Sequence, residues 1–251
     1  MLDAAVLLED DELLRYTLEG PHGFYNQMNH SVLEDGFWYE GDNYHFATLP
    51  SLVNMAEICL HNGIDLYHRE FNGHTLEDLF AAPLKTLQPD GSFPSRKDSP
   101  YASTFSQRWY SGLYELAHRR YPGATFAQAL VKMYANEPAA GQELLNAAGL
   151  MDVFEKVSAR RSDLDWRGFL AAEPSLMRAG EMQGLKSVDM RGTGLAVLRQ
   201  DRGESYLSVD YGHYGGGHGH PDRLALTWFA RGRRWLCDYG TGNYYFDHLR
   251  W

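Results

Sequence analysis

The spacing of the apolar residues changes from helical to strand-like late in this chain of 251 residues. Before the change, apolar positions recur at helical spacing and predict several helices. One of these helices ends at residue 60, and the others span residues 2–18, 75–88, 102–120, 124–136, 141–150, 152–159 and 166–171. Residues 173–183 indicate a linker. After it, period-two segments predict strands at 187–190, 193–199, 206–210, 224–230 and 235–239. Helices followed by strands predict an α+β fold or two domains, which we place at residues 1–180 and 181–251.

Local signals sharpen two of the predicted helix boundaries. Gly20 and Pro21 end the first helical segment. Thr75 followed three residues later by Asp78 is typical of a capping box at the start of a helix. We expect Pro83 to bend that helix, because proline removes a backbone donor.

The charge and composition of the chain exclude some classes of protein. The formal net charge of −10 argues against a general nucleic-acid binder, which normally has a basic face. A hydrophobic content of 44% is enough for a sizeable core, and no apolar run reaches membrane-spanning length. The N-terminus lacks the pattern of a signal peptide. Cys59 and Cys237 are expected to be free thiols unless the fold brings them together.

A glycine-rich loop between two predicted strands, residues 213–221, carries the most distinctive chemistry. His218 and His220 flank one glycine, so in an extended segment both side chains project to the same side. Asp238 lies on the strand that would return next to this loop. A histidine and an aspartate brought together across a hairpin could begin a zinc site, although zinc requires at least three protein ligands.

Two other interpretations of this loop stay open from the residues alone. It could be a surface glycine loop whose histidines are simply solvated. Alternatively, His218, His220 and Asp222 spell the HxHxD pattern of binuclear metal hydrolases. That pattern continues with a further histidine, whereas Arg223 follows here.

Several sequence motifs, in this order, resemble the heparinase II/III-like polysaccharide lyases and their alginate-lyase relatives. The motifs are EGDNYHF (40–46), LQPDGSFPSRKDS (87–99), MRGTGLAVLRQ (190–200), YLSVDYG (206–212) and GGGHGHPDRLALTWFARGRRWLCDYGTGNY (215–244). The resemblance implies an incomplete (α/α) toroid of helical hairpins followed by stacked antiparallel β-sheets. It also implies cleavage of uronic-acid polysaccharides by β-elimination. The chain would be a partial one, with the helical domain incomplete and the sheet domain cut at Trp251.

The resemblance also implies roles for individual residues. His45 or its neighbour Asn43 matches the residue that neutralises the uronate carboxylate. Tyr101 matches the tyrosine that acts as base and acid, with Tyr110 as the second choice. His218 matches the catalytic histidine of the β-domain.

The metal ligands and the substrate-binding cations follow in the same way. His220 and Asp238 match two ligands of a structural zinc ion, whose third ligand is expected beyond Trp251. Arg96 and Arg108, with Lys97, lie close to Tyr101 in sequence and could hold carboxylates or sulfates of the substrate. An ordinary solvated surface is the alternative for these cations.

The chemistry of elimination suits these residues. Removing the proton α to a carboxylate develops negative charge, which must be stabilised where it appears. A tyrosine with a pKa of about 10 is a poor base unless a nearby cation lowers its pKa, and His218 could supply that cation. We therefore expect an anionic polysaccharide or oligosaccharide as the partner, with neither nucleic acid nor membrane involved.

Two rival functions remain open from the sequence. A glycoside hydrolase on a similar toroid would use carboxylates such as Glu40, Asp42 or Asp98. A non-catalytic carbohydrate-binding fragment is the other possibility. Half a toroid and an open sheet edge also predict self-association or loss of activity. The resemblance suggests a periplasmic or secreted location, which the chain itself leaves undetermined.

Overall fold

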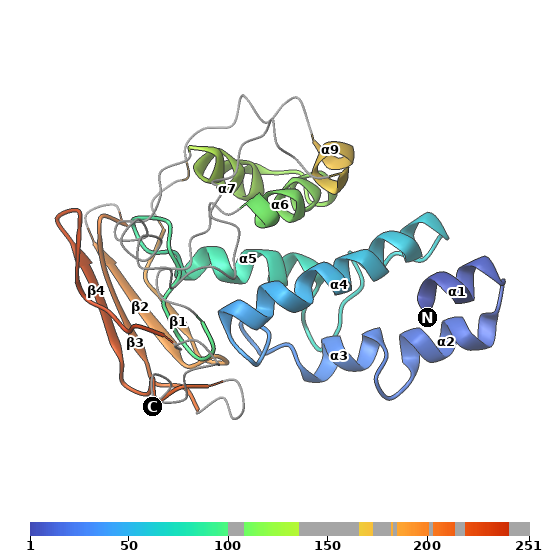
Figure 1. Cartoon of the computed structure of the whole chain (residues 1–251), viewed down its shortest axis with the longest axis horizontal. Coiled ribbons are helices and arrows are strands. Elements are labelled where there is room, and N and C mark those ends of the chain that lie inside the picture. Colours follow the sequence, from blue (N-terminus) through green and yellow to red (C-terminus); the bar gives the residue numbers. More distant parts are fainter. Residues whose placement is uncertain are drawn as a thin grey trace, which may run out of the picture.

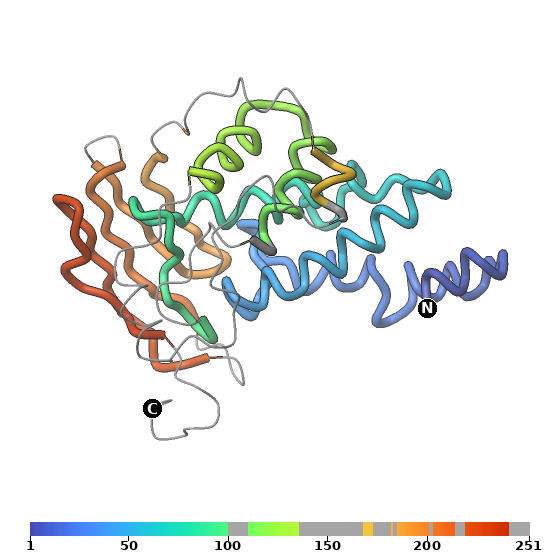
Figure 2. The backbone as a smooth tube through the Cα atoms, turned by 45° about the horizontal axis from the view of Figure 1, so that its top comes forward, coloured from blue at the N-terminus to red at the C-terminus, as the bar shows by residue number. Residues whose placement is uncertain are grey.

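The computed structural model of the chain describes residues 1–99, 108–135, 166–172, 182, 185–200, 203–213 and 219–240. Its helices are α1 (Leu2–Leu7), α2 (Asp11–Glu19), α3 (Phe24–His30), α4 (Asp42–His61), α5 (Leu76–Thr86), α6 (Arg108–Arg120), α7 (Ala124–Tyr134) and α9 (Trp166–Ala171). Its strands are β1 (Val188–Met190), β2 (Leu195–Gln200), β3 (Ser205–Asp210), β4 (Leu226–Ala230) and β5 (Arg233–Leu236). The sheet lies at one end of the molecule and α1 and α2 at the other (Figures 1 and 2). The predicted α+β class is confirmed.

The first predicted helix is in fact two. Glu9 has a left-handed backbone with φ of 53°, which ends the helical hydrogen-bond pattern after α1. Asp10 then caps α2, because its Oδ1 accepts a hydrogen bond from the Leu13 N–H at 2.9 Å. The helical spacing of apolar residues continues across this break, so the sequence did not indicate two separate helices. The predicted helices at 141–150 and 152–159 lie outside the described residues.

Helices α4 and α5 form the centre of the helical part. The α4 side chains Phe46, Leu49, Leu52 and Val53 are all buried in the main hydrophobic core. Asp78 Oδ2 accepts from the Thr75 N–H at 2.9 Å, and the predicted capping box at α5 is confirmed. Pro50 and Pro83 lie inside α4 and α5, respectively.

The five strands form an antiparallel sheet in the order β1-β2-β3-β4-β5. Alternation along β3 and β4 turns Tyr206 and Phe229 toward the helices, where they pair in register. Together with Val197 they pack against Phe37 and Ala82 in a second core cluster. The sheet therefore docks on α5 and on the segment before α4.

The starts of strands β4 and β5 differ from the sequence prediction for reasons that the backbone shows. Strand β4 begins at Leu226 instead of 224, because Leu224 has a φ of 63°. Strand β5 begins at Arg233, since the preceding turn uses only Arg231 and Gly232, both with positive φ. Two such residues are what a tight hairpin turn requires.

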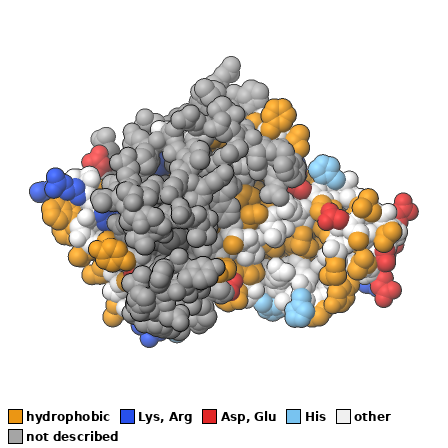
Figure 3. Space-filling model, viewed as in Figure 1, with side chains coloured by type: hydrophobic (Ala, Val, Ile, Leu, Met, Phe, Trp, Pro, Cys, Tyr) orange, Lys and Arg blue, Asp and Glu red, His pale blue; other side chains and the backbone are white. Residues whose placement is uncertain are grey.

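The surface carries exposed apolar side chains on both parts. On the face of the sheet turned away from the helices, Leu198, Trp228 and Leu236 are exposed. Figure 3 shows hydrophobic side chains on the visible surface of both the sheet end and the helical end. Among the described helices, none is long and apolar enough to cross a membrane. Cys59 and Cys237 are free thiols, as expected.

Candidate active site

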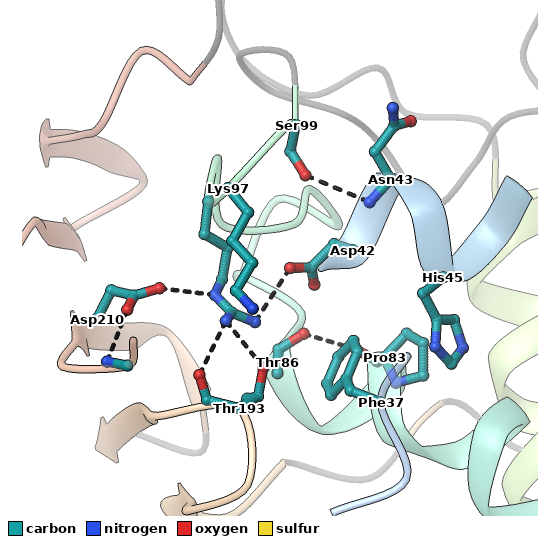
Figure 4. A network of polar contacts seen from close by, with 12 residues as sticks. Phe37, Asp42, Asn43, His45, Pro83, Thr86, Lys97, Ser99, Thr193 and Asp210 are labelled. Atoms are coloured by element: carbon teal, nitrogen blue, oxygen red, sulfur yellow. Dashed lines mark hydrogen bonds and ion pairs between the residues drawn. The ribbon is translucent and has the colours of Figure 1, made fainter. Parts of the chain in front are cut away.

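The segment from Gln88 to Ser99 lies between the helical part and the sheet, and Arg96 is its most connected side chain. Arg96 donates from Nε to Asp210 Oδ2 at 2.8 Å and from Nη1 to Asp42 Oδ2 at 3.2 Å. Its Nη2 donates to the hydroxyl and the main-chain carbonyl of Thr193, at 2.8 and 3.2 Å. Figure 4 shows Asp42 and Asp210 approaching this site from the start of α4 and the end of β3. One guanidinium thus joins α4, the β1–β2 turn and β3.

The charges of this network are buried. Burial by itself lowers the pKa of Arg96, but the carboxylates of Asp42 and Asp210 raise it above its usual value. Burial raises the pKa of Asp42, and Arg96 opposes that shift. Asp42 Oδ1 is buried and has no hydrogen-bond partner in the described part of the chain. Arg96 therefore stays charged, with two carboxylates beside it.

Arg96 is consequently not placed to bind a substrate. Its side chain is 2% exposed and its donors face the carboxylates and the threonine of the chain itself. The adjoining cavity, lined by Ser95, Arg96, Asp210 and Asp222, has a volume of about 10 Å³. That volume suits about one water molecule, not a sugar. We therefore correct the expectation from sequence: Arg96 holds the two parts of the fold together.

His45 is also buried, which weighs against a role as a cation at the substrate carboxylate. Its Nδ1 accepts from the Trp38 N–H at 3.0 Å, and its Nε2 lies 2.8 Å from the Leu79 carbonyl oxygen. Burial lowers the pKa of His45 to about 4, so the ring is neutral at pH 7. This geometry favours Asn43 of the two alternatives for the carboxylate site.

Asn43 lies in the first turn of α4 with its side chain directed away from His45 (Figure 4). The residue is half-buried. Its main-chain N–H donates to Ser99 Oγ at 3.3 Å, which ties the end of the 88–99 segment to α4. No residue that the structure describes hydrogen-bonds the Asn43 side-chain amide, so this amide can donate to a ligand.

The remaining catalytic candidates lie mostly beyond what the structure describes. Tyr101 and His218 are outside the described residues, and so is the side chain of Arg108, the first residue of α6. Tyr110, the second choice for the base, is described and buried, and its ring packs at a tilt against Phe46 with ring centroids 4.2 Å apart. Burial raises the pKa of Tyr110, so less of this residue is in the deprotonated form that could remove a proton at neutral pH.

His220 and Asp238 are brought together as the hairpin pattern predicted. His220 Nε2 lies 2.9 Å from Asp238 Oδ1, and His220 Nδ1 contacts the main-chain carbonyl oxygen of Lys97. Burial by itself lowers the pKa of His220, but the Asp238 carboxylate and the Lys97 carbonyl raise it overall. A carbonyl oxygen only accepts, so Nδ1 carries the hydrogen and Nε2 faces the carboxylate.

This arrangement fits part of a zinc site. A metal-bound histidine commonly donates its other ring N–H to a carbonyl or carboxylate, as Nδ1 does here to Lys97. Within the described ranges, however, no group of three or more histidine, cysteine, aspartate or glutamate side chains could hold a metal ion. His220 and Asp238 are two side chains of the type that binds zinc, and zinc needs three or four.

Comparison with known families and structures agrees with the motifs. Residues 182–250 match the family described as heparinase II/III-like, C-terminal. This C-terminal segment is heparinase II/III-like. The resemblance drawn from the sequence motifs is therefore confirmed.

The fold likeness to solved heparinases extends over the helical part as well. The crystal structure of the heparan sulfate lyase HepC from Pedobacter heparinus matches with a TM-score of 0.59 at 15% identity, covering 92% of this chain and 30% of that one. A heparinase III structure matches with a TM-score of 0.59 at 11% identity, covering 95% of this chain and 33% of that one. The chain thus spans about a third of the length of these structures. Comparison with curated protein sequences gives no match.

Two aspartates of the candidate site make contacts that the sequence did not predict. Asp210, at the end of β3, accepts from Arg96 through Oδ2 and from the Gly212 N–H through Oδ1, at 2.8 and 3.0 Å. Asp222 accepts from the Lys97 N–H at 2.6 Å. The position of Asp210 at the end of a predicted strand is only a weak indication that it belongs to the site. Nothing in the sequence indicates that Asp222 contacts Lys97.

The carboxylates proposed for a hydrolase are occupied or buried. Glu40 Oε2 accepts from the Trp38 indole N–H at 2.7 Å. Asp42 is paired with Arg96, and Asp98 is 3% exposed. In this arrangement the three carboxylates do not form an open pair across which a glycosidic bond could lie.

Proposed function

We propose that this chain carries much of the catalytic site of a heparinase II/III-like polysaccharide lyase that cleaves uronic-acid-containing glycans by β-elimination. One observation carries the proposal. Within four residues, the 96–99 segment contacts both Asn43, through Ser99, and His220, through the Lys97 carbonyl. The candidates from the helical part and from the sheet therefore converge on the segment that leads to Tyr101.

The proposed reaction assigns one task to each residue. The Asn43 amide donates to the uronate carboxylate and stabilises the charge that develops there. Tyr101 removes the proton α to that carboxylate, the C–H electron pair becomes the new double bond, and the glycosidic C–O bond breaks. Tyr101, or Tyr101 together with His218, returns a proton to the leaving oxygen. No water is consumed, and Arg108 is assigned to substrate anions.

We also propose that His220 and Asp238 are two ligands of a structural zinc ion. The Lys97 carbonyl supports this role because it orients His220 with Nε2 toward Asp238. When bound, zinc would fix the segment after β5, which carries Asp238, to the segment that carries His220. Its other ligands are not among the described residues.

The architecture of the lyase is part of the same proposal. Residues 1–180 correspond to part of an (α/α) toroid, and residues 181–251 to the first sheet of a β-sandwich. The likeness in fold to heparan sulfate lyase HepC over 92% of this chain supports that assignment.

Ultraviolet absorbance tests the activity, because β-elimination leaves an unsaturated sugar that absorbs and hydrolysis does not. The purified chain is mixed with heparin, heparan sulfate, hyaluronan, chondroitin or alginate. We expect absorbance to rise with one class of glycan and to be abolished by Tyr101→Phe, His218→Ala and Asn43→Ala. The matched controls Tyr16→Phe and His22→Ala change exposed residues in the N-terminal part and should keep full activity.

Two outcomes would overturn the proposal. New reducing ends without absorbance would indicate a hydrolase. Glycan binding without any cleavage, unchanged by Tyr101→Phe, would indicate a carbohydrate-binding chain.

A further inference from the structure

Lys97 has a backbone conformation that lysine rarely adopts. Its φ is 52°, in the left-handed region, and the residue is only 7% exposed. A non-glycine residue stays in this region only where its surroundings hold it there, and such residues gather at functional sites. The contacts of Lys97 show what holds it.

Both main-chain polar groups of Lys97 contact side chains from the β3–β4 connection. The Lys97 N–H donates to Asp222 Oδ2 at 2.6 Å, and the Lys97 carbonyl oxygen accepts from His220 Nδ1. The left-handed conformation directs the N–H of Lys97 toward Asp222 and its carbonyl toward His220, two positions earlier in the sequence. His220 in turn contacts Asp238 through Nε2.

The side chain of Lys97 is held from the opposite side, by the segment that enters α4. Its Nζ donates to the Tyr39 carbonyl oxygen at 2.7 Å. Its aliphatic stem crosses Gly41, where an added Cβ would lie 2.9 Å from Lys97 Cβ and Cδ. The ammonium group is thus bound to main chain next to α4, not presented as a free cation to a substrate.

We propose that Lys97 is a positioning residue, whose left-handed main chain orients the His220 imidazole toward Asp238, and that turnover depends on this orientation. The orientation of His220 stands on these contacts alone. Its consequence for turnover rests on the proposed lyase function.

A series of substitutions at Lys97 separates the main chain from the ammonium group. Lys97→Gly, Lys97→Asn, Lys97→Ala and Lys97→Val all remove the ammonium group. They differ in the ease of adopting positive φ, which is greatest for glycine, intermediate for asparagine and least for valine. Asparagine and alanine form the matched pair if Lys97→Val does not fold.

The first readout is the hydrogen on His220 Nδ1, seen by NMR of the full chain with ¹⁵N-labelled histidine rings and assigned with His220→Gln. This readout does not depend on any lyase activity. We expect the bonded Nδ1–H signal of the wild type to persist in Lys97→Gly and Lys97→Asn, and to weaken or vanish in Lys97→Ala and Lys97→Val. Loss in all four variants would assign the role to the ammonium group, and retention in all four would show that Lys97 does not orient His220. Either result overturns the proposal.

The second readout is turnover in the absorbance assay. A displaced catalytic loop lowers kcat by about tenfold to a hundredfold, so kcat should follow the order Gly, Asn, Ala, Val. KM should change by less than about threefold, because substrate contacts are kept. If the wild type cleaves no glycan, the proposed function fails while the NMR series still decides the role of Lys97. Equal kcat in Lys97→Asn and Lys97→Ala would contradict the link to catalysis.

Discussion

Arg96 and Asp210 form a buried ion pair across the boundary between the helical part and the sheet. Arg96 Nε lies 2.8 Å from Asp210 Oδ2, and the two side chains are 2% and 8% exposed. They are 114 positions apart in sequence. Removing one partner of a buried pair leaves the other charge without compensation, so this contact makes the docking of the sheet sensitive to single substitutions.

Substitution Arg96→Met should therefore destabilise the chain by about 3–5 kcal/mol. The control is Arg191→Met, since the Arg191 side chain is 80% exposed and its pair with Asp189 is a surface one. That control should cost less than about 1 kcal/mol. Urea unfolding followed by circular dichroism measures both. Equal stability of the two variants would contradict the conclusion that Arg96 holds the sheet against the helical part.

Gly41 should be intolerant of a side chain. Its φ of 101° and ψ of −173° are essentially restricted to glycine, and the Lys97 stem occupies the space of a Cβ. We expect Gly41→Ala to cost about 2–4 kcal/mol. Gly63→Ala is the matched control, because Gly63 also has positive φ, 81°, but nothing lies within 4 Å of its added Cβ. The control should cost about 1 kcal/mol in thermal unfolding.

His45 should make stability depend on pH. Its pKa falls from 6.5 to about 4 on folding, so the unfolded chain binds more protons between these values. The contribution of His45 to the free energy of unfolding is complete above pH 6.5. About 3 kcal/mol of it is lost as the pH falls toward 4. Urea unfolding at several pH values should show a smaller loss over this range for His45→Gln than for the wild type. Identical pH profiles would contradict a neutral, buried His45.

Stabilisation by zinc should depend on His220 and Asp238. Where zinc binds, it should raise the free energy of unfolding by about 2.7 kcal/mol at a hundred times Kd, and a chelator should reverse the effect. Asp238→Asn should abolish the response. Asp65→Asn is the control, because Asp65 forms an exposed pair with His68 at 2.7 Å. Equal responses of the two variants would exclude the proposed ligands.

Sequence patterns predicted those parts of the fold that depend on local spacing. The helix-to-sheet order, the cap at Thr75 and the meeting of His220 with Asp238 follow from periodicity, capping chemistry and hairpin geometry. The break at Glu9 could not be predicted, because its left-handed backbone leaves the apolar spacing unchanged.

The roles within the candidate site were harder to predict. Arg96 and His45 resemble ligand-binding residues in type, and only their burial shows that they bind the chain itself. The ion pair between Arg96 and Asp210 joins segments that are 114 positions apart. A single sequence does not indicate which residues pair over such a separation.

The origin of the oxygen at the cleaved bond tests the lyase proposal most directly. The substrate found in the absorbance panel is cleaved in water enriched in heavy oxygen, and the products are weighed by mass spectrometry. Elimination consumes no water, so we predict products without heavy oxygen at the cleaved bond. The product that carries the new, unsaturated non-reducing end should be one water lighter than its hydrolytic counterpart. Heavy oxygen incorporated at that bond by cleavage would show hydrolysis and contradict the account.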